Sequence, residues 1–481
     1  MTIAPPLWLR SLVILALLAG CGGNSRQNSA PLSPEDVNLI FVVSEDLAFH
    51  ASGDMDPSTA NLTAQGLQRS LLLGTFLHEQ VLGGNDVSRI YALAPTTHLQ
   101  TPQQLPDLVP LETIEQFAVL NHSTLSSDLV GGTPYTGENS PIRCSYAPGS
   151  VPPGVPVPPQ YCPTCGGLDF ADSGGVNEAL VSALLSEGHP GYYVLSAPWE
   201  TVRALLGSFD HTLPLPDAYE GPDRIYALTL HPSGSIALAT YDAGLAPAAT
   251  YPALPSPITQ RGCTPATPST LTVRGGVDGA AVPAVVNNNE TVYIVRHAEA
   301  HPHGYWSDNN YVGAGQWRAL DLPNALLGKV APDEVWSLDP ASFSQGTVSA
   351  EGEQYWSSVA PALTVAPYAI ANGLPFRFAS SLDLTSASLA QTSSDLFFTR
   401  GSFSGRKLLL GWTFTQAPQM IAALVASYFP DGGAPAVPSW SPTDYDSLWI
   451  VTLDASGNLT LDFSQCEGID SASLPEAAPR F

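Results

Sequence analysis

The chain of 481 residues contains the same order of segments twice, and this repeat constrains its fold more than any other feature. The clearest match pairs DRIYALTLHPSGSIAL, which begins at Asp223, with DSLWIVTLDASGNLTL, which begins at Asp446. In both stretches, alternating apolar residues flank a Ser-Gly turn, a pattern typical of a β-hairpin because glycine adopts positive φ easily. We therefore expect an internal duplication in which a hairpin ends each copy.

Earlier segments of the two copies follow the same order. The matched segments are the strands 38–43 and 291–296, the strands 88–95 and 333–340, and the strand-turn-helix units 191–206 and 407–424. A helical stretch after each first strand contains a glycine, and aligning Gly66 with Gly315 also aligns Arg69 with Arg318. Alternation of strands and helices predicts an α/β fold, with two tandem α/β sandwich domains and mainly parallel central sheets.

The repeat and the changes in composition divide the chain into five parts. We expect a signal peptide at 1–21, a flexible tether at 22–37, a first domain at 38–243, a linker at 244–288 and a second domain at 289–481. The first domain carries a Pro- and Cys-rich insertion near 139–168, and the linker is rich in Ala, Pro, Thr and Gly.

The N-terminus is typical of an export signal. Arg10 precedes a short apolar run, and Leu18-Ala19-Gly20-Cys21 resembles a bacterial lipobox, which implies cleavage before Cys21 and a lipid on its sulfur. The alternatives are a plain secretory signal and an uncleaved anchor. Gly22 resembles the sorting pattern of outer-membrane lipoproteins, so we expect a lipid-anchored protein of the cell envelope, in the outer membrane.

The charge of the chain excludes one class of partner. With 43 acidic and 17 basic side chains, the formal net charge is -26. Nucleic-acid binding depends on clustered Lys and Arg that contact phosphates, so we expect no nucleic-acid partner.

Five cysteines remain after Cys21, so an exported chain has disulfide candidates and one thiol left over. Cys162 and Cys165 have the spacing of a redox or metal motif. Their Pro- and Gly-rich surroundings favour a loop disulfide over redox or zinc chemistry.

The second copy also carries a catalytic motif. Its first strand ends in VRHAE at 295–299, followed by a helix that contains Gly315 and a second strand that ends near Pro340. This layout resembles the histidine phosphatase superfamily, also called phosphoglycerate mutase-like, with its Arg-His-Gly signature. The resemblance implies that a histidine attacks phosphorus and that arginines and a second histidine surround the phosphate oxygens.

Carried over residue by residue, the resemblance makes His297 the nucleophile and Arg296 the clamp that binds the phosphate. Glu299 is the candidate general acid, with Asp308 as an alternative. His301 is a candidate proton donor and substrate contact; the alternative is a partly exposed loop histidine. Arg318 has an equivalent in Arg69, which favours a structural role. The family chemistry needs no metal and no cofactor.

The chain departs from the family pattern at two further positions. Asp339 lies where a second arginine would follow the second strand, and Phe414 lies where a second histidine is expected; no histidine follows His303. In the first copy, Val43 and Ser44 occupy the places of Arg296 and His297, so we expect no phosphohistidine chemistry there.

Three functions are compatible with these residues. The first is a lipid-anchored protein in which phosphohistidine chemistry is impaired or lost, and which binds an envelope partner of unknown kind. The second is an active phosphomonoesterase of the histidine acid phosphatase type, acting on a small phosphorylated substrate through His297 and Arg296. The third is a thiol oxidoreductase that uses Cys162 and Cys165, which lacks a strand-to-helix context. The two missing charges favour the first.

Overall fold

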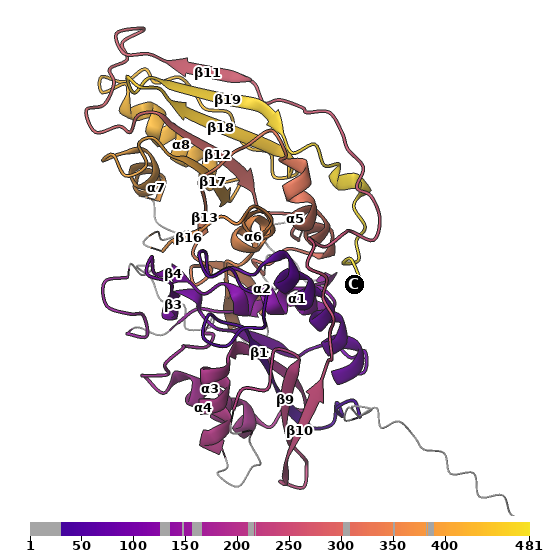
Figure 1. Cartoon of the computed structure of the whole chain (residues 1–481). Helices are drawn as coiled ribbons and strands as arrows, with labels where there is room; N and C mark the ends of the chain where they lie inside the picture. The colour runs from indigo at the N-terminus through magenta and orange to yellow at the C-terminus, as the bar shows by residue number, and fades with distance from the viewer. Residues whose placement is uncertain are drawn as a thin grey trace, which may run out of the picture.

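The computed structural model describes residues 30–125, 135–146, 149–155, 166–209, 216, 218–301, 308–349, 352–380, 382 and 389–481. It is a mixed α/β protein with two large sheets (Figure 1). The predicted signal peptide with Cys21, and the residues Cys162, Cys165 and His303, lie outside the described residues. Below, the first half denotes residues 30–243 and the second half residues 289–481.

The sheet of the first half has six described strands in the order β10-β9-β1-β8-β2-β7. Their bounds are β1 Val37–Ser44, β2 Arg89–Ala92, β7 Ile142–Arg143, β8 Gly191–Pro198, β9 Arg224–Leu230 and β10 Ile236–Asp242. Strands β1, β8, β2 and β7 are parallel, whereas β9 and β10 form the predicted hairpin. β1 is buried along its whole length, which explains its continuous apolar run.

The second sheet repeats this order with one strand added, as β11-β19-β18-β12-β17-β13-β16. Its strands are β11 Thr270–Val273, β12 Glu290–Arg296, β13 Glu334–Leu338, β16 Phe376–Ala379, β17 Lys407–Trp412, β18 Ser447–Leu453 and β19 Leu459–Cys466. The registers match as well, since Val43 lies opposite Ala197 in β8 and Arg296 lies opposite Trp412 in β17. Both predicted hairpins turn at a glycine with positive φ, Gly234 at 82° and Gly457 at 75°.

Eight α-helices are described: α1 Ala64–Phe76, α2 Val109–Ala118, α3 Val176–Glu187, α4 Trp199–Phe209, α5 Gly313–Ala325, α6 Ala360–Asn372, α7 Leu389–Phe398 and α8 Gln416–Ser427. α2 and α6 both have a proline as their second residue, Pro110 and Pro361, which is favourable because an N–H in the first turn lacks a helical partner. α3 and α4 cover the outer face of the first sheet, and α7 and α8 cover that of the second.

Helices α1, α2, α5 and α6 lie between the two sheets (Figure 1). Their apolar residues form one continuous core that includes Phe117 of α2, Leu322 of α5 and Leu363 of α6. The C-terminal segment also reaches the first half, because the Gln116 side chain donates to the carbonyl of Pro479 over 2.8 Å. The halves therefore share a core rather than meeting at a wet surface.

Short ladders and single turns complete the described structure. They are β3 Leu99–Gln100 with β4 Leu105–Pro106, β5 His122–Leu125 with β6 Tyr135–Glu138, β14 Phe343–Ser349 with β15 Gly352–Ser357, a π-helical turn at Leu77–Val81 and 3-10 turns at Pro95–Thr97 and Ser471–Ser473. Chain segment 99–106 folds back as a hairpin against the second half, where β4 lies beside β16.

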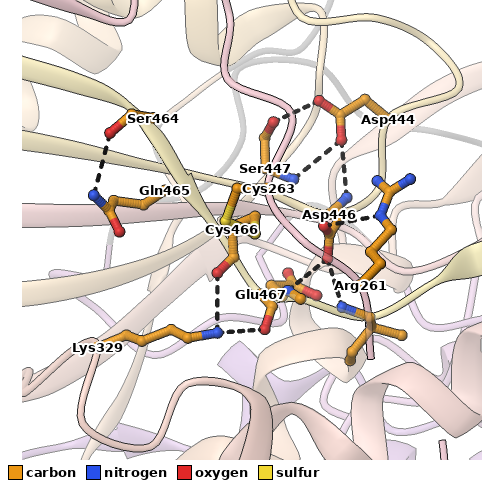
Figure 2. Close-up of a disulfide and its surroundings, with 12 residues drawn as sticks. Arg261, Cys263, Lys329, Asp444, Asp446, Ser447, Ser464, Gln465, Cys466 and Glu467 are labelled. Atoms are coloured by element: carbon orange, nitrogen blue, oxygen red, sulfur yellow. Dashed lines mark hydrogen bonds and ion pairs between the residues drawn. A yellow bond between two sulfur atoms is a disulfide. The ribbon is translucent and has the colours of Figure 1, made fainter. Parts of the chain in front are cut away.

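The segment 244–288 is more ordered than its composition predicts. It contributes β11 to the edge of the second sheet, and Cys263 forms a disulfide with Cys466 at the end of β19 (Figure 2). Arg261 beside it donates to Asp446 over 3.2 Å. Cys144 is a buried free thiol. The linker is thus tied to the second half by covalent, ionic and ladder contacts.

Candidate functional site

The loop that carries the Arg-His motif is positioned by a glycine on α5. A Cβ atom at Gly315 would lie 2.5 Å from the carbonyl oxygen of Glu299, closer than any side chain tolerates. In the first half, the backbone carbonyl of Asp54 lies against Gly66 in the same way. The aligned glycines therefore allow each helix to touch the loop that follows the first strand.

An aligned arginine on each helix holds the same loop by ion pairs. Arg69 donates to Asp54 over 2.6 Å and to Asp223 over 2.5 Å. Arg318 donates to both carboxylate oxygens of Glu299, at 2.8–2.9 Å, and approaches Asp446 at 3.7 Å. It also donates to Glu467 over 2.5 Å. These contacts agree with the structural role expected for Arg318.

The pairing with Arg318 argues against the predicted role of Glu299 as general acid. A carboxylate that accepts three hydrogen bonds from a guanidinium is held as an acceptor, whereas a general acid must donate a proton. The alternative acid, Asp308, is also engaged: its Oδ2 lies 3.2 Å from Nε2 of His301. Both carboxylates are thus engaged by side chains other than His297.

His297 directly follows β12 and is held by two backbone carbonyls, one of the neighbouring strand β17 and one of the next residue in the chain. Its N–H donates to the carbonyl of Trp412, and its Nδ1 lies 2.9 Å from the carbonyl of Ala298. Because a carbonyl only accepts, Nδ1 carries the proton and Nε2 is left with a free electron pair. Burial, together with the charge of Arg296, lowers the pKa of His297 to about 3. The imidazole is therefore neutral at physiological pH, as a nucleophile requires.

Arg296 ends β12, and its guanidinium is enclosed by the protein. Nη1 donates to the carbonyls of Pro442 at 2.8 Å, Asp444 at 3.2 Å and Ser441 at 3.4 Å. The rings of Phe414 and Tyr445 lie 4.2 Å and 3.8 Å from its central carbon. Burial lowers the pKa of Arg296. Arg296, which was predicted to bind phosphate, thus holds the segment 441–445 in place. This contact was not predicted from the sequence.

Phe414 and Asp339, the two residues that differ from the pattern of the resemblance, lie after β17 and β13, as the sequence predicts. Phe414, two residues after β17, stacks on Arg296 where the resemblance places a second histidine. Asp339, the residue after β13, is fully buried, and burial raises its pKa to about 6. A carboxyl group and a phenyl ring thus lie at this edge of the sheet, where the resemblance predicts an arginine and a histidine.

His301 lies elsewhere than predicted. Its side chain is fully buried rather than partly exposed, and Nε2 lies 3.0 Å from Oδ1 of Asn139 in the first half. Asn139 in turn donates to the carbonyl of Tyr311. His301 therefore belongs to a polar contact between the halves, and this placement does not support a role in binding substrate.

In the first half, the loop after β1, which corresponds to the loop after β12, is acidic. Val43 and Ser44 are buried at the end of β1, as the alignment placed them. Burial and the neighbouring Asp54 raise the pKa of Glu45 well above its usual value. Arg69 lies 3.6 Å from Glu45 and also pairs with Asp54 and Asp223, so three carboxyl groups surround one guanidinium, which disfavours an anion here.

One histidine of the first half, His98, has a defined set of contacts that was not predicted from the sequence. His98 follows β2, its Nδ1 lies 2.9 Å from Oδ2 of the buried Asp107, and its ring stacks on Phe170 at 3.7 Å. Although burial disfavours the charged ring, the hydrogen bond to Asp107 raises the pKa of His98. The position after a second strand was the available signal, but the partners come from distant segments.

The described residues contain neither a cluster of metal ligands nor a helix that could span a membrane. No group of three or more His, Cys, Asp or Glu side chains in this part of the chain is arranged to hold a metal ion. Among the described helices, none combines the length and apolar character needed to cross a bilayer.

No protein-family model and no curated protein matches the chain. Twelve chains of solved structures are similar to this chain, and they include the following three histidine phosphatase relatives. A mycobacterial glucosyl-3-phosphoglycerate phosphatase in complex with inorganic phosphate is 12% identical, covers 37% of this chain and 99% of its own, and has a TM-score of 0.22. An open reading frame product of Mycobacterium tuberculosis is 13% identical and covers 37% of this chain and 100% of its own, with a TM-score of 0.22.

The third is a protein named phosphohistidine phosphatase SixA from Nakamurella multipartitia. It is 13% identical, covers 41% of this chain and 96% of its own, and has a TM-score of 0.21. TM-scores in this range are too low to support a conclusion about the fold or activity of this chain.

Proposed function

We propose that this chain is a cell-envelope lipoprotein built from two histidine phosphatase-like domains in which phosphohistidine chemistry has been lost. Its duplicated body then serves to bind an envelope partner or a small ligand. The shared strand order and the aligned Gly, Arg and Asp contacts of the two halves support the duplication and the domain division. The lipobox-like sequence at Cys21 supports the lipid anchor and an outer-membrane location.

The enclosure of Arg296 is the observation that carries this proposal. Phosphoryl transfer needs several fixed positive donors around three charged oxygens, and removing one such donor costs about 10² to 10³ in rate. Here the guanidinium is covered by Phe414 and Tyr445, and Nη1 is engaged by backbone carbonyls. With Asp339 in place of a second arginine, the loop keeps its shape without the charges that phosphate requires.

One observation favours the alternative, an active phosphomonoesterase. The hydrogen bond between Nδ1 of His297 and the carbonyl of Ala298 orients the ring with Nε2 unprotonated, which is the state of an attacking nucleophile. The alternative would need a proton donor other than Glu299.

An enzyme assay distinguishes the proposed loss of phosphohistidine chemistry from an active phosphomonoesterase. It measures hydrolysis of a generic aryl phosphate from pH 4 to 8, by the full chain and by its His297→Ala variant. We expect equal background rates for both proteins, on this compound and on a small panel of phosphomonoesters. Turnover that disappears in the variant would overturn the proposal and establish an enzyme. A Gln391→Ala variant, changed on the exposed surface of α7, serves as the matched control for handling and purity.

A further inference from the structure

A cavity of about 290 Å³ lies between the halves, away from His297. One wall is the hairpin of β3 and β4, with Gln103 and Gln104 in its turn. The other wall is formed by β13 and β16 of the second half, with Trp336, Arg377, Phe378 and the following Ser380. Figure 1 shows β3 and β4 next to β16, which is an edge strand of the second sheet.

The register of β13 and β16 defines the shape of this cavity. Trp336 and Arg377 are direct partners in neighbouring parallel strands, so both side chains lie on the same face of the sheet. Phe378, the next residue, points to the opposite face. Since side chains from both faces line the cavity, it extends around the free edge of β16.

The charges at the cavity cancel. Nε of Arg377 donates to Glu334 over 3.3 Å, and this is its only hydrogen bond among the described residues. Among the described residues that line the cavity, Arg377 is the only one with a charged side chain. Because its charge is paired and the chain carries a net charge of -26, an anionic ligand gains little here and is repelled at long range. The site fits a neutral ligand.

The hydrogen-bonding groups indicate a ligand rich in hydroxyls. Gln103 and Gln104 each offer a donor and an acceptor, Ser380 offers both, and Arg377 adds donors. A hydroxyl group also donates and accepts, so it matches this mixed set, whereas a carboxylate only accepts. Trp336 is partly exposed and packs edge-on against Phe397 and Phe403, which fixes its ring.

We propose that this cavity binds a neutral saccharide of one or two rings, with its hydroxyls on Gln103, Gln104 and Arg377 and an apolar face against Trp336. The volume lies at the lower end of the range for small-molecule sites, about 300–1,000 Å³, which limits the ligand to this size. The location between two domains is also a preferred one for ligands.

Calorimetric titration of the purified full chain in a sugar-free buffer tests the proposal, with D-glucose, D-galactose, N-acetyl-D-glucosamine and maltose as probes. We expect at least one to bind saturably, and the Gln103→Ala/Gln104→Ala variant to weaken that binding at least tenfold. The double variant Arg377→Met/Glu334→Gln, which keeps the charge balanced, should weaken it similarly. Gln391→Ala on exposed α7 should leave it unchanged.

Three outcomes would overturn the proposal. One is the absence of saturable binding by every probe. Another is binding with the same affinity in the Gln103→Ala/Gln104→Ala variant, which would place the sugar elsewhere. The third is tighter binding of benzoate than of any sugar, which would assign the cavity to an anion. The surface glutamines can be replaced without disturbing the core, so these results do not depend on a destabilised fold.

Discussion

Gly315 and Arg318 show how single residues fix the loop that carries His297. Gly315 lets α5 approach the carbonyl of Glu299, and Arg318, fully buried one turn later, holds the carboxylate of that same residue. The first half uses Gly66, Arg69 and Asp54 in the same way. In both halves these residues fix the shape of the loop that follows the first strand.

Replacing Gly315 with alanine should destabilise the protein by about 1–3 kcal/mol, the range for an overpacked site, because the new Cβ would overlap the Glu299 carbonyl. Urea denaturation measures the change in the free energy of unfolding. Gly207 of α4 has open space around it, so Gly207→Ala should instead stabilise by about 0.5–1 kcal/mol. An unchanged midpoint for Gly315→Ala would contradict the close approach.

At the scale of elements, the segment 440–446 decides what the candidate site can do. Trp440 packs against Trp449 of β18, and its indole donates to the carbonyl of Asp444. This turn presents its carbonyls to Arg296 and places Tyr445 against the guanidinium. The segment therefore fills the space beside the end of β12, next to His297.

The segment 260–273 acts as an arm across the second half, secured by the disulfide between Cys263 and Cys466. These cysteines are 203 residues apart. Cross-linking so long a loop restricts the unfolded chain, so the Cys263→Ala/Cys466→Ala variant should lose about 2–4 kcal/mol of stability. Thermal unfolding of this variant and of the wild type, both without reductant, measures the loss of stability. A Cys144→Ala variant distinguishes loss of a buried thiol from loss of the cross-link.

Local elements were predictable from the sequence, whereas contacts between segments that are distant in the chain were not. The alternation of strands and helices, both hairpins and the alignment of Gly66 with Gly315 follow from local pattern and from the repeat. The burial of His301, by contrast, depends on Asn139 more than 160 residues away. The covering of Arg296 depends on a turn with no apolar periodicity, and β11 lies in a stretch whose composition favours a linker. Such outcomes are decided by tertiary packing.

At the scale of the whole molecule, buried carboxyl groups link stability to pH. Glu112 and Glu115 of α2 line a small cavity of about 20 Å³ between the halves, opposite α5 and α6, with no basic side chain in its walls. Such a volume holds about one water molecule. Burial raises the pKa of Glu112 to about 8 and that of Glu115 well above its usual value. Glu290, in β12, also has its pKa raised by burial to about 8.

These shifts predict a protein that is more stable at pH 5 than at pH 8. Between an unfolded pKa near 4.5 and a folded pKa near 8, the folded chain binds more protons, so the free energy of unfolding falls as pH rises. For Glu112 the loss is up to about 5 kcal/mol. Denaturant titrations across this range should show a shallower decline for Glu112→Gln. The exposed Glu178→Gln is the control, and an unchanged slope in Glu112→Gln would contradict the assignment.

The shared helical layer also has a consequence for the order in which the protein is made. The apolar faces of α1 and α2 are covered by α5 and α6, which emerge from the ribosome some two hundred residues later. The contact between Gln116 of α2 and the carbonyl of Pro479 forms last of all. Until then, the first half carries an unfinished surface that is prone to aggregation. The first half thus completes its fold only after α5, α6 and the segment around Pro479 have been made, so removal of that segment should affect both halves at once.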